Sequence, residues 1–512
     1  MSLLEEILED LSKTVKYDGL TKEMILLTGI SAFSSNPSNL YIKGPSSTGK
    51  SYNVIQCMKY FPENCVTSFG SLSPTAMIHD RGGRLESSDN RQIGIREEAS
   101  GKASYFYEDC PGEIIPKDMI AQIIASSHYR VDLRNRIMVF LESPALQTLE
   151  MLRPILSHDK EEITYKITEK TKSGRLKALT TKITGWPAVI FCSASPRYMH
   201  EIITRTPTIS AQEFPEKFLA ANHMAGLAAS HPKRENEAAS ALSLRLSNLI
   251  SEMKYFDVII PYGEQLADVL PSSQASDMRH FNHYQNMIKN YTVFSMNNRP
   301  FIRYHKKYLK GLGPDETYCI STLEDLSSFS RIYEEYSESI DSGLPSKALE
   351  IARCLRDLGP SSSEDISKAT RSRPNTMFRS AKRLVSYELK LLKSANIVSS
   401  AADADDKRRQ IYAIINPDEF SDGENPRLSP SPVLSISFGQ KECFSWLDGI
   451  CNEIGISNIE EAIANDKLVL GLGNRAVSKD GFISHILSKP IPTPLLVDYP
   501  KNMGVSKKPI SS

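Results

Sequence analysis

The sequence lacks the marks of several common protein classes. It carries no net charge, because 61 Lys and Arg residues balance 61 Asp and Glu residues, which excludes a protein that is basic over its whole surface. No apolar run approaches the roughly 18 residues that cross a bilayer, and the acidic segment 1–11 does not resemble a signal peptide. Its eight cysteines form no C-x-x-C pair, the usual start of a zinc or redox motif. We therefore expect a reduced, cytoplasmic protein that binds no membrane.

The composition that remains is that of a globular protein with several domains. A chain of 512 residues corresponds to about three domains, and 40% hydrophobic with 24% charged residues is ordinary for such chains. Strand and helix patterns alternate to about residue 198, which predicts an α/β fold with a parallel sheet. The expected parts are N-terminal helices at 1–35, an α/β core at 36–210, a mainly helical region at 211–336, a small domain at 345–417, a linker at 418–440, and a small helical module with a loose tail at 441–512.

The strongest motif is a phosphate-binding loop between an apolar strand expected at 39–43 and a helix that starts near Tyr52. Its backbone N–H groups would cradle phosphate, Lys50 would neutralise the β- and γ-oxygens, and the Ser51 hydroxyl would bind Mg²⁺. The pattern therefore predicts ATP and Mg²⁺ as cofactors; a glycine turn that only caps a helix is the alternative. The motif G-x-x-x-x-G-K-[ST] consists of Gly44, Pro45, Ser46, Ser47, Thr48, Gly49, Lys50 and Ser51.

Two apolar segments that end in acids compete to supply the carboxylate that holds the metal and polarises the attacking water. Segment 137–142 is uniformly apolar up to Glu142, as a central parallel strand buried on both faces should be. Segment 104–109 ends in Glu108 and Asp109, but it carries tyrosines and belongs to an expected insertion at about 82–130. We favour Glu142 and keep Asp109 and Glu108 as reserves.

A basic β-hairpin is expected at 162–184, after the strand that ends in Glu142 and before a buried strand at 186–195 that contains Ser193. Between Lys166 and Lys182 there are six basic residues and one acid, a net charge of +5. The alternative is a hairpin that its lysines merely keep soluble.

This order of loop, acidic strand, basic hairpin and hydroxyl-bearing strand resembles AAA+ ATPases with a hairpin inserted before the sensor 1 strand. The similarity is greatest to minichromosome-maintenance-like DNA helicases of phages and mobile elements, and it covers about 20–303. It implies a P-loop AAA+ domain with a helical lid at 211–336 that works as a hexameric ring. In such proteins the hairpin grips nucleic acid in the pore, so the resemblance makes Lys170, Lys172 and Arg175 candidate DNA contacts.

The resemblance extends to further residues of the catalytic site. Ser193 corresponds to sensor 1, and Arg205 corresponds to the arginine finger that completes a neighbour's site, with Arg197 as the alternative. Arg279 corresponds to the sensor 2 arginine of the lid. The sequence departs from the family at Leu141, where many AAA+ proteins have an Asp, so Glu142 would have to serve both water and metal.

The small domain at 345–417 shows three helical segments followed by a two-stranded wing, which resembles a winged helix-turn-helix. Eleven basic residues and four acids between 366 and 410 give it a net charge of +7, which favours DNA over a protein partner. A recognition helix that starts near Asn375 would offer Asn375, Thr376 and Arg379 to a groove, and the wing would place Lys407, Arg408 and Arg409 on phosphates.

Together these features predict an ATP-dependent DNA helicase or translocase, a ring-shaped homo-hexamer in the replication of a mobile element or virus. Single-stranded DNA would occupy the pore, duplex DNA would bind the winged helix, and a primase or polymerase would be a separate chain. One alternative is an AAA+ switch that loads or remodels a protein complex at DNA sites without processive unwinding; another is a regulator with a vestigial ATPase. A second glycine pattern around Gly471 and Gly473 predicts a turn, since no βαβ unit follows it.

Overall fold

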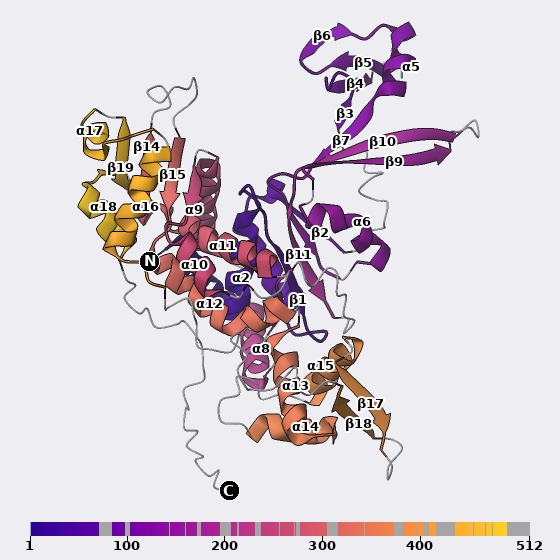
Figure 1. The fold of residues 1–512 in the computed structure, drawn as a ribbon. Coiled ribbons are helices and arrows are strands. Elements are labelled where there is room, and N and C mark those ends of the chain that lie inside the picture. The colour runs from indigo at the N-terminus through magenta and orange to yellow at the C-terminus, as the bar shows by residue number, and fades with distance from the viewer. Residues whose placement is uncertain are drawn as a thin grey trace.

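The structure of this chain is a computed structural model, and it confirms an α/β fold built on a parallel sheet (Figure 1). Among its described helices none is long and apolar enough to cross a membrane. The residues that the structure describes are 2–70, 84–97, 103–142, 144–158, 160–170, 176–194, 206–211, 214–230, 237–254, 256–270, 272, 277–304, 316–342, 344–372, 382–395, 397–403, 409–415, 436–453, 455–465, 467–473 and 475–488.

The central sheet has five strands in the order β12-β1-β11-β8-β2, and every neighbouring pair is parallel. Three of these strands are buried along their whole length, which is why they read as unbroken apolar runs in the sequence. Their bounds are β1 Asn39–Lys43, β2 Val66–Phe69, β8 Ile137–Phe140, β11 Ala188–Ser193 and β12 Thr208–Ser210.

Alternate residues of these strands pack on opposite faces of the sheet. Leu40 and Ile42 of β1 belong to the large core that the N-terminal helices cover, while Tyr41 packs in a second core with α6. On this second face Tyr41 and Phe191 stack with their ring centroids 5.4 Å apart. The helices that share these two cores with the sheet include α1 Leu3–Thr14, α2 Gly19–Ser31, α3 Lys50–Met58 and α6 Leu146–Leu156.

The hairpin forms over the residues in which it was expected, with antiparallel pairing of Leu176 to Lys170 at one end and Thr184 to Glu162 at the other. It is part of a second sheet in the order β3-β7-β10-β9, which projects from the core (Figure 1). The insertion adds a third sheet, β4-β5-β6, and the helix α5. The bounds are β3 Arg84–Glu86, β4 Ile93–Glu97, β5 Ala103–Tyr107, β6 Cys110–Ile114, α5 Lys117–Ser126, β7 His128–Asp132, β9 Glu162–Lys170 and β10 Leu176–Thr184.

The helical region after the core contains strands that the sequence analysis missed. The strands β13, β14 and β15 form a fourth sheet, and β19 of the C-terminal segment completes it by pairing with β14. The elements are α8 Pro215–Ser230, α9 Glu237–Met253, β13 Asp257–Ile259, α10 Gly263–Val269, α11 Asp277–Phe294, β14 Pro300–Tyr304, β15 Glu316–Ile320 and α12 Leu323–Ser342.

The C-terminal segment is mostly helical, as expected, but its described part, 436–488, does not form a module of its own. The segment contributes β19 and β20 to the fourth sheet, and its Cys443, Leu447 and Phe482 are buried in the same large core as the N-terminal helices. The expected turn is present at Gly473, whose φ is +55°. The elements are α16 Gln440–Glu453, α17 Ile459–Ala464, β19 Leu468–Leu472, β20 Arg475–Ala476 and α18 Lys479–Ile486.

The small domain has its own apolar core, which includes Ile351, Leu355, Val385 and Leu392. Three helices precede the strands β17 and β18, and the short strand β16 between the first and second helix completes a sheet in the order β16-β18-β17. Ser362 caps the second helix, because its hydroxyl accepts a hydrogen bond from the Asp365 N–H at 3.3 Å. The bounds are α13 Ser346–Leu358, β16 Ser361–Ser362, α14 Ser363–Ser372, α15 Lys382–Ser394, β17 Val398–Ala402 and β18 Gln410–Ile414.

Candidate nucleotide site

The glycine-rich loop connects β1 directly to α3, as the motif requires. Three of its residues have positive φ: Gly44 at +148°, Ser47 at +67° and Gly49 at +86°. Glycine tolerates such angles at little cost, so Gly44 and Gly49 permit the tight path from strand to helix. The loop thereby brings the N-terminus of α3 to the carboxyl end of the sheet, the geometry that binds phosphate groups.

Lys50 is the first residue of α3 and its side chain is buried against the loop. Its Nζ donates to the carbonyl oxygen of Gly44 at 2.8 Å and also to that of Pro45. The Thr48 hydroxyl donates to the same Pro45 oxygen at 3.0 Å. These bonds hold the ammonium group inside the curve of the loop, where a bound phosphate would meet it.

Ser51 lies next to the end of β8, because its hydroxyl donates to the Leu141 carbonyl at 3.4 Å. Glu142 is the next residue and is exposed at the carboxyl edge of the sheet. Ser193 is buried at the end of β11, in register with Lys43 at the end of β1. The strand order therefore gathers Ser51, Glu142 and Ser193 at the edge that carries the loop.

The reserve acids lie in a different part of the molecule. Glu108 and Asp109 form the turn between β5 and β6 of the insertion, away from the parallel sheet (Figure 1). Asp109 makes an ion pair with Arg91 at 3.0 Å, and Arg91 stacks on Tyr107. Neither acid is near the loop, so Glu142 is the acid that the fold brings to the candidate site.

A buried polar cluster that the sequence analysis missed is hydrogen-bonded to the loop. Lys217 of α8 donates to the Thr48 carbonyl at 3.0 Å and forms an ion pair with Asp18. Asn53 of α3 donates to the same Asp18 carboxylate at 2.7 Å. The turn signal at Asp18 and Gly19 was visible in the sequence, but nothing local indicates that Lys217, about 170 residues beyond the loop, would reach it.

Lys43, which directly precedes the loop, is fully buried. Burial lowers the pKa of this lysine to about 7, although the negative charge of Glu388 in the small domain acts in the opposite direction. Burial also raises the pKa of the neighbouring Cys192 thiol to about 11, which keeps it protonated and unreactive. The site thus includes a buried lysine whose pKa depends on an acid of a second domain.

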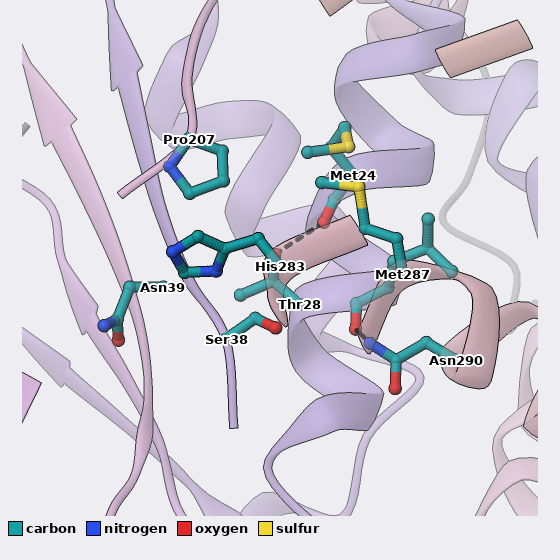
Figure 2. A pocket seen from close by; sticks show the side chains of 9 residues that line it. Met24, Thr28, Ser38, Asn39, Pro207, His283, Met287 and Asn290 are labelled. Carbon is teal, nitrogen blue, oxygen red and sulfur yellow. Dashed lines mark hydrogen bonds between the residues drawn. The ribbon is translucent and has the colours of Figure 1, made fainter. Parts of the chain in front are cut away.

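Arg279 is exposed near the start of α11, which packs against α2. The two helices run in opposite directions: Tyr291 donates to Glu23 near the start of α2, whereas His283 lines a small pocket with Ser38, beyond its end (Figure 2). The C-terminal end of α2 leads into the amino end of β1, at the edge of the sheet opposite the loop. The placement argues against a sensor 2 role for Arg279 at the loop of its own chain.

The hairpin concentrates its charge away from its base. Lys182 near the base lies 3.7 Å from Glu162, and Arg130 of β7 lies 3.5 Å from the same carboxylate. Lys170 ends β9. The predicted tip residues Lys172 and Arg175 lie outside the described residues.

Among the remaining predicted residues of the small domain, Arg409 directly precedes β18, where it is half-exposed and lies 3.9 Å from Glu364. The predicted residues outside the described part of the chain are Arg197, Arg205, Asn375, Thr376, Arg379, Lys407 and Arg408.

A scan against protein-family models found no match, and a search of curated proteins found no similar protein either.

Proposed function

We propose that this chain is an ATP-driven DNA helicase or translocase of the AAA+ type, working as a ring-shaped oligomer in DNA replication of a mobile element or virus. The residues at the carboxyl edge of the sheet fit MgATP. Lys50 and the loop N–H groups would bind the phosphates, and Ser51 and Glu142 would hold the metal. MgATP, when bound, supplies the phosphoanhydride bond that is cleaved.

Each remaining residue at this edge has a role that follows from its chemistry. The Glu142 carboxylate would accept a proton from the attacking water, and the Ser193 hydroxyl would orient that water or the γ-phosphate. Arg205 of a neighbouring subunit would neutralise the charge that develops on the phosphate. Asp18, Asn53 and Lys217 would keep the loop in its binding conformation.

The observation that carries the proposal is the position of the basic hairpin. It is inserted between β8 and β11, the two strands whose carboxyl ends bear Glu142 and Ser193. The segment that forms the hairpin starts at the carboxyl end of β8, next to Glu142, and ends at the amino end of β11, the strand that carries Ser193. A change at Glu142 therefore acts directly on the start of this segment. A positively charged tip linked to a hydrolytic site in this way suits the movement of a nucleic-acid backbone.

The test compares ATP hydrolysis and strand separation in the wild type and in a Lys170→Ala/Lys172→Ala variant. We expect single-stranded DNA to stimulate the wild-type ATPase several-fold, and the variant to lose stimulation and unwinding while basal hydrolysis stays within about twofold. A Lys13→Ala/Lys59→Ala variant removes two exposed lysines elsewhere and should behave as the wild type. Normal unwinding by the hairpin variant would overturn the role of the hairpin.

The second candidate is a nucleotide-dependent switch that remodels a protein complex at DNA sites without unwinding. The small domain favours it, because the Tyr387 hydroxyl of this domain accepts a hydrogen bond from the Gly44 N–H of the loop at 3.2 Å. A switch predicts an ATPase that single-stranded DNA hardly stimulates, so the same assay separates the two functions.

A further inference from the structure

The small domain is joined to the nucleotide-binding domain by polar contacts at the two strands beside the loop. Its core is separate from those of the central sheet. Lys347 of α13 is nonetheless buried, and its Nζ donates to the carbonyl of Ala211, just after β12, at 2.6 Å. A lysine is seldom buried unless its charge has partners, so this contact indicates a specific docked position.

The second contact is made by α15 at the end of β1. Glu388 is fully buried and its negative charge acts on Lys43, the last residue of that strand. Glu388 is therefore close enough to Lys43 for its charge to act on the end of β1, which places α15 beside the point where β1 enters the loop.

The third contact reaches the loop itself and leads on to Lys50. Gly44 donates its N–H to the Tyr387 hydroxyl, and the carbonyl of the same glycine accepts the bond from Lys50. Tyr387 is 8% exposed, so water competes little for this bond. One residue of the loop thus connects a side chain of the small domain with the lysine that would bind phosphate.

We propose that Tyr387 is a positioning residue of the nucleotide site, through which the small domain sets the affinity of the loop for ATP. This inference rests on the proposed function, because it requires that the loop binds nucleotide. The segment predicted to bind duplex DNA, 375–379, comes shortly before α15 in the chain. The proposal therefore predicts that duplex DNA on this domain changes the affinity for ATP. Because coupling between two ligands is reciprocal, ATP would then change the affinity for duplex DNA by the same factor.

The experiment uses the full-length chain with Tyr387→Phe, which keeps the ring and removes only the hydroxyl. Tyr412→Phe is the matched control, because Tyr412 lies in the same domain and its hydroxyl donates to Gln410 on the surface. We expect Tyr387→Phe to raise KM for ATP roughly three- to tenfold with kcat within about twofold, and to abolish the effect of duplex DNA on ATP affinity. The control should match the wild type in both measurements.

Hydrogen exchange of the Gly44 amide, measured without nucleotide, tests the contact independently of ATP hydrolysis. Exchange that is at least about threefold faster in Tyr387→Phe, but not in Tyr412→Phe, supports the inference. Wild-type values of KM and of exchange in Tyr387→Phe would overturn it while the proposed function stands. A wild-type chain that binds no ATP would overturn the proposed function, and the coupling with it.

Discussion

At the scale of single residues, the proposed function assigns nucleotide binding and hydrolysis to different side chains. Lys50 is held within the loop by the Gly44 and Pro45 carbonyls, where it would contact a bound phosphate. Glu142 follows the strand beside Ser51 and is exposed at the edge of the sheet, where a metal and a water could both reach it. The two residues should therefore affect different steps.

We expect Glu142→Gln to lower kcat for ATP hydrolysis by roughly 10²–10⁴-fold while ATP affinity changes little, because the amide retains the shape but cannot accept a proton. Titration with a labelled nucleotide and steady-state hydrolysis measure the two quantities. Asp109→Asn is the control, since this acid pairs with Arg91 in the insertion and should leave hydrolysis unchanged. Normal hydrolysis by Glu142→Gln together with a large loss in Asp109→Asn would instead identify Asp109 of the insertion as the catalytic acid.

At the scale of elements, local patterns predicted the strands that pair with near neighbours or lie wholly in the core. The strand β1 and the hairpin have the predicted bounds, because a buried parallel strand is an unbroken apolar run and hairpin partners adjoin in the sequence. The fourth sheet was missed because β14 pairs with β19, far along the chain. Short segments such as these carry no local sign of their partner.

Gly471 offers a test of this pairing, because it lies opposite Phe301 of β14 and a Cβ there would come within 2.2 Å of the phenyl ring. We expect Gly471→Ala to lower the free energy of unfolding by about 1–3 kcal/mol through overpacking. Gly449→Ala is the matched control in α16, where no atom lies within 4 Å of a new Cβ. There the change should raise the stability by about 0.5–1 kcal/mol. Urea unfolding measures both, and equal stability of the two variants would contradict the packing.

At the scale of the whole molecule, the described residues form three apolar cores, which do not follow the order of the sequence. The largest unites the N-terminal helices, one face of the central sheet, the helices α9 to α12 and the C-terminal segment. The contact between Gly44 and Tyr387 joins residues 343 positions apart. No pattern within a short window can predict such contacts, so the nucleotide loop was predictable while its supports were not.

This organisation predicts that the C-terminal segment is required for folding. A chain that ends at residue 435 lacks β19 and the buried Phe438, Leu447 and Phe482, so we expect it to be insoluble or destabilised by more than about 4 kcal/mol. A chain that ends at residue 488 keeps every described residue of that core and should unfold at the wild-type temperature. Soluble yield and thermal unfolding measure the effect. A chain ending at residue 435 that is soluble and as stable as the wild type would refute the shared core.

The pairing of β14 with β19 also determines when the fourth sheet can be completed during synthesis. About 160 residues of chain separate Tyr304 from Leu468, which corresponds to roughly 8–30 s of translation. Throughout that interval the nascent chain exposes an unpaired strand edge and an incomplete core, a state prone to association with other chains. The large apolar core can therefore be completed only after the C-terminal segment has left the ribosome, and the need for chaperones should be greatest just before that moment.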